Sequence, residues 1–473
     1  MTAANRPPAV RLGFVGRPDT WWVETLEGVS PTEALVRRLT TRAVARPAED
    51  GRPVPDLGTW RWAGDTLLIT LDEVSWSDGR PVRAEDLASA LERAGTRARF
   101  LPLVRAEAIG PRRVRLTFAP DTAPCPAATE ALFWPLGEGV WPPARTLGPY
   151  RVAVASPSWQ LRPRRPDDVE VLLVPFDDGR TLARAWTEGD VDLIVGDTWL
   201  YGRTPPPPPP SGDVRDLPGS ALAALVFRLD HPVLGDPIVR RALALATDPA
   251  ALAVRAYGAP LPSLTALLPP GHWAAPEAGV AVGDAAAAGQ QLGRAGWRDR
   301  DGDGVRENDV GEPLALTLAL PYSLTDARWE ELGPLLAEQW RQVGVELTLS
   351  YQAPFSLRER LSNGQWDVAL LVYAVGPDPD QQFLWAPPDE NPLARDLNVM
   401  GYANEEVSRL MREAARVPGC LPEERARLYR QAWARIGRDA PFVPLFPLPV
   451  RLFVGERATP LMPWVSSALG SPP

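Results

Sequence analysis

The sequence contains no lysine, so all 50 of its basic side chains are arginines, against 59 acidic ones. Without lysine the chain cannot form a Schiff base through a side-chain amine, and it cannot complete a phosphate-binding loop that ends in Gly-Lys. The formal charge of 50 − 59 = −9 argues against nucleic acid, or an anionic membrane surface, as the main partner.

Histidine and cysteine are nearly as scarce, with two of each. His231 and His272 give little material for a His-based triad or a metal centre, and they make nickel capture an unfavourable interpretation. Cys125 and Cys420 are too few for a disulfide framework or a four-thiolate metal site. They can pair only if the fold brings them together, which the sequence does not show.

Catalytic motifs are also missing, since no G-x-S-x-G, H-E-x-x-H, C-x-x-C or G-x-G-x-x-G pattern occurs. Asp378 and Asp380 offer a carboxylate pair of the kind that glycosidases use. Acids two residues apart in a Pro-rich loop are, however, more often turn formers. The sequence therefore predicts a protein that is not an enzyme.

No apolar run approaches the ~20 residues that a helix needs to cross a bilayer. The opening residues, MTAANRPPAVRLGF, lack a basic segment followed by an apolar core, so they are not a signal peptide. Either a signal has been removed from this chain, or the protein stays in the cytoplasm. Its 473 residues, 45% of them hydrophobic, are enough for two or three globular domains.

Strand and helix patterns alternate along the chain, and this alternation predicts an α/β fold with mostly parallel sheets. Six consecutive prolines, 205–210, predict a stiff surface loop. The strands are predicted at 9–15, 112–118, 147–152, 314–320, 345–351, 367–375 and 443–446. The helices are predicted at 84–94, 326–342, 356–361, 404–415 and 422–438, with two short ones that start at Asp236-Pro237 and Asp248-Pro249.

Tryptophan is abundant, with 18 residues, and most of these are expected in the core. Aromatic side chains in loops can instead line a pocket and stack on an organic ligand, although they can also seal a surface between domains. The tryptophans in predicted loops include Trp21, Trp22, Trp273 and Trp385.

Seven segments, taken together, resemble the extracellular solute-binding proteins of family 5, the substrate-capture subunits of peptide and nickel ABC importers. They occur in the family's order and span roughly residues 10–455. The segments are VSWSDGRPVRAEDLASALERA (74–94), LGPYRV (147–152), WTEGDVDLIVG (186–196), DPIVRRALALATDPAAL (236–252), AGWRDRDGDGVRENDVGEPLALTL (295–318), WDVALLVYAVGPDPDQQFLW (366–385) and YANEEVSRLMREA (402–414).

The resemblance implies a two-lobed, periplasmic-binding-protein-like fold of type II, with the extra subdomain of the large peptide-binding members. The chain would cross between the lobes near 228–235 and 441–450. The implied domains are lobe I (1–228 and 445–473, with the extra subdomain at about 45–150) and lobe II (229–444).

The resemblance also implies how such a protein works. A peptide or other small organic ligand would bind in the cleft between the lobes and be enclosed by hinge closure. The protein would need no cofactor, act as a monomer and deliver its ligand to a membrane permease from an extracytoplasmic position, periplasmic or lipid-anchored. The alternative is a cytoplasmic ligand-sensing domain of a larger regulator with the same fold.

One position departs from the peptide-binding pattern. In peptide-binding members an aspartate just before an Asp-Pro-Asp-like turn holds the α-ammonium group of the peptide. The stretch GPDPDQQF aligns on this turn and places Val375 at the anchor position. Because valine cannot balance a charge, either Asp378 or Asp380 replaces the anchor, or the ligand carries no free ammonium group.

The expected cleft residues follow from the resemblance and from loop chemistry. Trp21, Trp22, Tyr373 and Trp385 are expected to stack on the ligand, and Asp378, Asp380 and Gln381 to provide polar selection. His272 and Trp273 are weaker candidates. Arg358 and Arg360 would meet an anionic end of the ligand, or alternatively form a solvated helix face.

The stretch GWRDRDGDGVRENDVGE resembles a calcium-binding loop, because Asp299, Asp301 and Asp303 alternate and Glu307 follows. Position 12 is Val310, where a bidentate glutamate is needed, and a strand pattern follows in place of a helix. Members of the resembled family often carry such a stretch. The favoured interpretation is a tight turn held by aspartate side chains, and the alternative is a weak structural calcium site.

Overall fold

A computed structural model of the protein describes residues 9–16, 30–94, 104–119, 123–137, 141–155, 158–196, 212–322, 327–387 and 397–469. Trp21, Trp22 and the proline run at 205–210 lie outside these ranges. Within them, no helix has both the length and the apolar character needed to cross a membrane.

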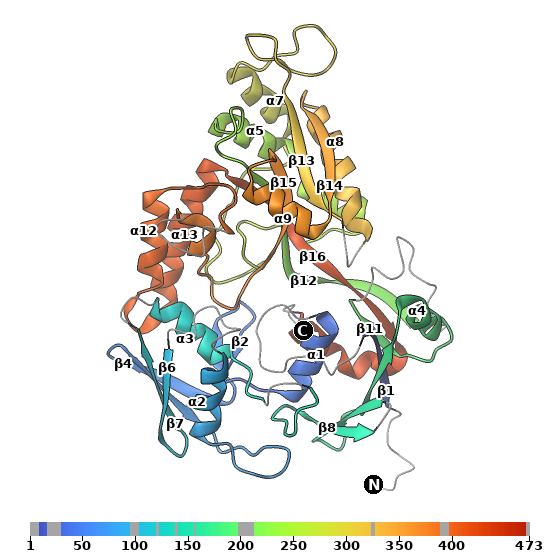
Figure 1. Ribbon diagram of the computed structural model, residues 1–473, viewed down its shortest axis with the longest axis vertical. Helices are drawn as coiled ribbons and strands as arrows, with labels where there is room; N and C mark the ends of the chain where they lie inside the picture. Colours follow the sequence, from blue (N-terminus) through green and yellow to red (C-terminus); the bar gives the residue numbers. More distant parts are fainter. Residues whose placement is uncertain are drawn as a thin grey trace.

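A ten-stranded sheet runs through the molecule in the order β14-β13-β15-β12-β16-β11-β1-β10-β9-β8. At its centre lie two long antiparallel strands, β12 (Gly212–Phe227) and β16 (Phe442–Gly455), which extend through both halves in Figure 1. Their pairing is irregular between Pro218 and Leu222. From Gly212 to Pro218, β12 pairs with β16 beside the first half of the sheet. From Ala221 to Phe227, β12 also pairs with β15 of the second half.

The first half of the sheet packs around the N-terminal strand. Ser30 accepts a hydrogen bond from the backbone N–H of Glu33 and caps the first helix, as the sequence pattern indicates. This half comprises β1 (Val10–Val15), β8 (Tyr150–Ala155), β9 (Ser158–Pro163), β10 (Val171–Phe176) and β11 (Leu193–Val195), with α1 (Pro31–Thr40), α4 (Gly179–Thr187), η8 (Glu456–Leu461) and α14 (Met462–Ala468).

A small subdomain is inserted between α1 and β8 and has a core of its own. Its four-stranded sheet, in the order β4-β5-β7-β6, packs against α2 and α3 at the lower left of Figure 1. Its elements are β2 (Ala45–Pro47), β3 (Pro53–Pro55), β4 (Gly58–Ala63), β5 (Thr66–Leu71), α2 (Ala84–Arg93), β6 (Val104–Gly110), β7 (Arg113–Phe118) and α3 (Pro124–Phe133).

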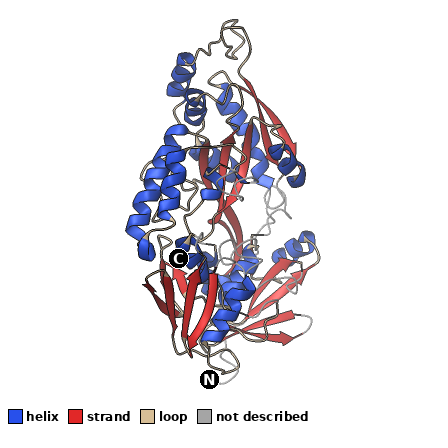
Figure 2. Cartoon of the chain, turned by 60° about the vertical axis from the view of Figure 1, so that its left-hand side comes forward, coloured by secondary structure: helices blue, strands red, loops and turns tan. Residues whose placement is uncertain are grey.

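The second half of the sheet forms the upper part of the molecule (Figures 1 and 2). β13 pairs in parallel with both β14 and β15, and helices cover the sheet. Its elements are α5 (Pro237–Ala246), α6 (Pro249–Tyr257), α7 (Ala285–Arg294), β13 (Ala315–Pro321), η6 (Ala327–Glu331), α8 (Leu332–Arg341), β14 (Glu346–Gln352), α9 (Pro354–Ser362) and β15 (Val368–Ala374).

A helical group completes the second half and packs on a further core, which includes Trp385, Tyr429 and Phe442. In Figure 1 its two main helices, α12 and α13, stand directly above α3 of the subdomain. The group comprises α10 (Gln382–Trp385), α12 (Glu405–Ala414), η7 (Pro418–Cys420) and α13 (Pro422–Asp439).

The predicted strands and helices are present, with two differences. The final strand, predicted at 443–446, extends over Phe442–Gly455, and the helix predicted at 326–342 is split into η6 and α8. The expectation of mostly parallel sheets is wrong. Among the described strands, only the pairs of β1 with β10 and β11 and of β13 with β14 and β15 are parallel. The subdomain sheet is antiparallel, and so are the central strands β12 and β16. They run in opposite directions because the chain enters the second half through β12 and returns through β16. The lobe limits remain a prediction.

Candidate functional site

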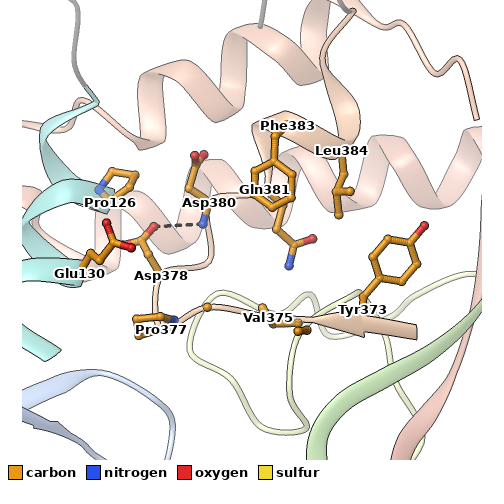
Figure 3. Close-up of a pocket in the computed structure, with 12 residues that line it drawn as sticks. Pro126, Glu130, Tyr373, Val375, Pro377, Asp378, Asp380, Gln381, Phe383 and Leu384 are labelled. Atoms are coloured by element: carbon orange, nitrogen blue, oxygen red, sulfur yellow. Dashed lines mark hydrogen bonds between the residues drawn. The ribbon is translucent and has the colours of Figure 1, made fainter. Parts of the chain in front are cut away.

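A partly open cavity lies where the subdomain meets the second half of the sheet (Figure 3). Pro126 and Glu130 of α3 line one side, and the segment 373–384, from the end of β15 through the turn into α10, lines the other. The cavity volume is about 40 Å³, room for only a few water molecules. In this conformation the enclosed part of the site therefore cannot hold a larger ligand.

Asp378 forms an ion pair inside the wall of this cavity. Both of its carboxylate oxygens accept from Nη2 of Arg425, at 2.7 and 2.9 Å, and Oδ2 also accepts from the Thr129 hydroxyl at 2.6 Å. Burial opposes the charge of Arg425, but the field of Asp378 outweighs it and raises the pKa of the guanidinium. The carboxylate predicted to contact the ligand is thus bound to a cation of the protein itself.

The other polar groups of the cavity come from the turn and from the end of β15. Asp380 is buried, and its backbone N–H donates to Asp378 at 3.0 Å. Gln381, 3% exposed, donates its amide N–H to the carbonyl of Leu267 at 2.5 Å. Among the described residues, its Oε1 and the Tyr373 hydroxyl have no hydrogen-bond partner. Figure 3 shows the Gln381 amide directed toward Val375 and Tyr373.

One edge of β15 lies open next to the cavity. β13 pairs with β15 at Val368 and Ala369, whereas β12 pairs with all seven residues of the strand. Beyond Ala369 the described part of the chain therefore places a strand on one side only. Val372 is 44% exposed there. Such an edge offers backbone donors and acceptors to an extended chain.

His272 and Trp273 lie where the second half touches the subdomain. The backbone N–H of Trp273 donates to the carbonyl of Asp50 at 2.9 Å, and the indole packs against Tyr429. His272 stacks on Trp273, and burial lowers the pKa of its imidazole to about 4. These two residues belong to the contact between the bodies and do not line the cavity.

Two further candidates are placed away from the cavity. Trp385 was expected in a loop, but it ends the short helix α10 and is fully buried between Tyr402, Trp433 and Phe442. Its ring therefore offers no face to a ligand. Arg358 lies on the exposed side of α9, in agreement with the solvated alternative.

Arg425 and Glu130 are site residues that the sequence interpretation missed. Each is a charged residue in an otherwise apolar stripe of a helix. A charge within such a stripe is visible in the sequence and could have identified both residues. Arg425 shares its stripe on α13 with the buried side chains of Leu428, Tyr429 and Ala432. Glu130 is the one charged residue of α3.

The acidic loop brings one oxygen from each of its four acids, Asp299, Asp301, Asp303 and Glu307, within 4.8 Å of the others. Asp299 accepts from the backbone N–H groups of Gly302 and Gly304, and Asp303 accepts from that of Val305. These bonds form the tight turns of the favoured interpretation. Calcium binding at the loop stays a prediction.

Cys125 and Cys420 form a disulfide, a pairing that the sequence left open. Cys125 lies in the first turn of α3 and Cys420 at the end of η7, so the bond joins the subdomain to the helical group. It lies one residue from Pro126 in the cavity wall.

Two half-sheets joined by two long strands, with a polar cavity between bodies that have separate cores, define a two-lobed α/β binding protein of type II. Residues 52–391 match the family described as "Bacterial extracellular solute-binding proteins, family 5 Middle". The chain belongs to this family and is a solute-binding protein, as the seven segments indicate.

Similar proteins agree with this assignment. Over 159 residues the chain is 26% identical to the oligopeptide-binding protein AppA of Bacillus subtilis, a match that covers 33% of this chain and 28% of AppA. It is 23% identical to an uncharacterized lipoprotein of Mycobacterium tuberculosis, with 94% of this chain and 89% of that protein covered.

Solved structures of other proteins share the fold of this chain. A nickel ABC transporter protein of Bacillus halodurans has a TM-score of 0.74 at 18% identity, with 94% of this chain and 95% of that chain covered. The AppA of Bacillus subtilis in complex with a nonapeptide has a TM-score of 0.63 at 15% identity, with 95% of both chains covered. The shared architecture therefore extends over nearly the whole chain.

Proposed function

We propose that this protein captures peptides, or organic ligands with a peptide-like backbone, for an ABC importer and delivers them as a monomer to a membrane permease. The single observation that carries the proposal is the open edge of β15, which leads into the cavity between α3 and the turn before α10. An extended ligand can add to this edge through backbone hydrogen bonds and place its end in the cavity.

The end of the ligand would be held without the carboxylate of Asp378, because Arg425 already neutralises it. Val375 stands at the position of the expected anchor and contributes only apolar surface. Gln381 presents a buried amide oxygen that has no partner among the described residues, so it is the group that gains most from a ligand N–H. We assign it the main polar contact.

Calorimetric titration with a defined mixture of di- to nonapeptides tests the proposal. We expect binding by the unaltered protein and a loss of about tenfold in affinity for Gln381→Leu, because one hydrogen bond to a buried group is worth roughly 1–2 kcal/mol. Gln290→Leu makes the same change on the exposed face of α7 and is the matched control. No heat with any peptide, or equal affinity for both variants, would contradict the assignment.

An extracytoplasmic location, periplasmic or lipid-anchored, belongs to the same proposal. Structural disulfides persist in oxidising compartments and are rare in the cytosol, so the Cys125–Cys420 bond supports export over a cytoplasmic sensing domain. Non-reducing peptide mapping of protein taken from intact cells checks this point. Fully reduced cysteines there would favour the cytoplasmic alternative.

A further inference from the structure

The disulfide connects two bodies that have separate cores. Ala128, Ala131 and Leu132 of α3 pack within the core of the subdomain. The helices on either side of Cys420, α12 and α13, pack within the core of the second half. The two cysteines are 295 positions apart in the sequence, so the bond joins distant parts of the chain across the surface that contains the cavity.

The other bonds across this surface are noncovalent, and they include the buried hydrogen bond from the Thr129 hydroxyl to Asp378 at 2.6 Å. The backbone N–H of Cys125 donates to the carbonyl of Ala415 at 3.1 Å. Arg52 pairs with Glu423 at 3.1 Å, but both side chains are exposed, 38% and 74%, and such a pair contributes less than about 1 kcal/mol. The covalent bond is therefore the strongest single link between the subdomain and the helical group.

The disulfide also restricts a movement that would enlarge the cavity. α3 forms one wall, and the turn before α10 forms the opposite wall. A ligand larger than a few water molecules can enter only if these walls separate. Cys125 precedes the wall residue Pro126 and is fixed to the second half through Cys420, while β12 and β16 join the two halves elsewhere. While this bond is intact, it limits how far bending at the long strands can part the walls.

We propose that the Cys125–Cys420 disulfide is a redox-sensitive latch, which restrains the movement of the subdomain away from the helical group when oxidised and allows the cavity to open further when reduced. Only one part of this inference rests on the proposed function, namely that the ligand enters through this opening. The restraint on movement follows from the disulfide between the subdomain and the helical group.

The two cysteines differ in solvent exposure, and this difference decides which sulfur atom a reductant attacks. Cys125 is fully buried, whereas Cys420 is half-buried between the exposed residues Gly419 and Leu421. A thiolate of a dithiol donor attacks the sulfur of Cys420, and the sulfur of Cys125 leaves and takes up a proton. The second thiol of the donor then attacks the mixed disulfide, releases Cys420 as a thiol and leaves the donor as a disulfide. Two electrons and two protons are transferred in total.

Amide hydrogen exchange of α3, combined with small-angle X-ray scattering and without any ligand, tests the latch. The samples are the oxidised protein, the protein reduced with dithiothreitol, and the double variant Cys125→Ser/Cys420→Ser. We expect the last two to exchange the amides of α3 on the order of tenfold faster and to have a larger radius of gyration. Thr129→Val is the control, because it removes a noncovalent bond across the same surface and keeps the disulfide.

Two results of the exchange and scattering measurements would contradict the latch. Unchanged exchange and scattering in reduced protein that retains its fold would overturn the latch, and so would a Thr129→Val protein as open as the double variant. If the double variant does not fold, the reduced protein decides the same question. Because no ligand is present, a negative result here leaves the peptide titrations as an independent test of the proposed function.

Discussion

At the scale of single residues, the pair of Asp378 and Arg425 matters most to the site, because both side chains are only 4% exposed. Desolvating two charges costs several kcal/mol each, and their attraction repays this only when the remaining donors and acceptors are satisfied. Here Thr129 and Tyr429 add hydrogen bonds to the pair. The pair therefore fixes the turn that forms one wall of the cavity.

Replacing Arg425 by methionine should lower the free energy of unfolding by about 3–5 kcal/mol, because the charge of Asp378 would stay buried without its partner. Chemical denaturation measures the change. The control is Arg409→Ala, which breaks an exposed pair with Glu413 and should cost less than about 1 kcal/mol. Similar losses for the two variants would contradict the role given to Arg425.

His272 makes stability depend on pH. Burial lowers the pKa of its imidazole from 6.5 to about 4, with Asp378 and Asp50 raising it and Arg425 lowering it by smaller amounts. Between these two pH values the unfolded chain binds the proton of His272 more readily than the folded protein does. The contribution of His272 to the free energy of unfolding is therefore complete above pH 6.5 and is lost as the pH falls toward 4. We expect His272→Gln to flatten this part of the profile. An unchanged profile from denaturation at several pH values would refute the assignment.

At the scale of elements, local chemistry was sufficient to place the helices and strands. Asp236 and Asp248 cap α5 and α6 through bonds to nearby backbone N–H groups, and Gly258 ends α6 in the left-handed conformation. These interactions span a few residues and are visible in sequence. The burial of Trp385 cannot be predicted locally, because it depends on Trp433 and Phe442, which come from other parts of the chain. The Cys125–Cys420 pairing cannot be predicted from the sequence for the same reason.

The acidic loop is an element whose stability we expect to be independent of calcium. Its aspartates accept backbone hydrogen bonds within the turn, so a cation is not needed to hold the chain. Adding calcium, or a chelator, should leave the Tm unchanged in thermal denaturation. A Tm that rises with calcium in the unaltered protein and not in Asp299→Ala would establish the calcium site instead.

At the scale of the whole molecule, the fold places its ligand site between bodies joined by a small number of connections. The long strands β12 and β16 are continuous through both halves, and Asp216 on β12 is held by Arg451 and by Arg328 of the second half. The disulfide joins the subdomain to the second half at another place. The sequence predicted the two-lobed class through a family pattern, but not which contacts close the cleft, because those partners are hundreds of residues apart.

We propose that the protein binds a peptide or peptide-like solute in this cleft. Mild heat denaturation of purified protein, followed by mass spectrometry of what is released, tests this proposal most directly. We expect a series of short peptides, or one compound with a peptide-like backbone, and less of it from Gln381→Leu. Release of a single compound without amide groups would contradict the claim and would mean that Val375 marks a different class of ligand.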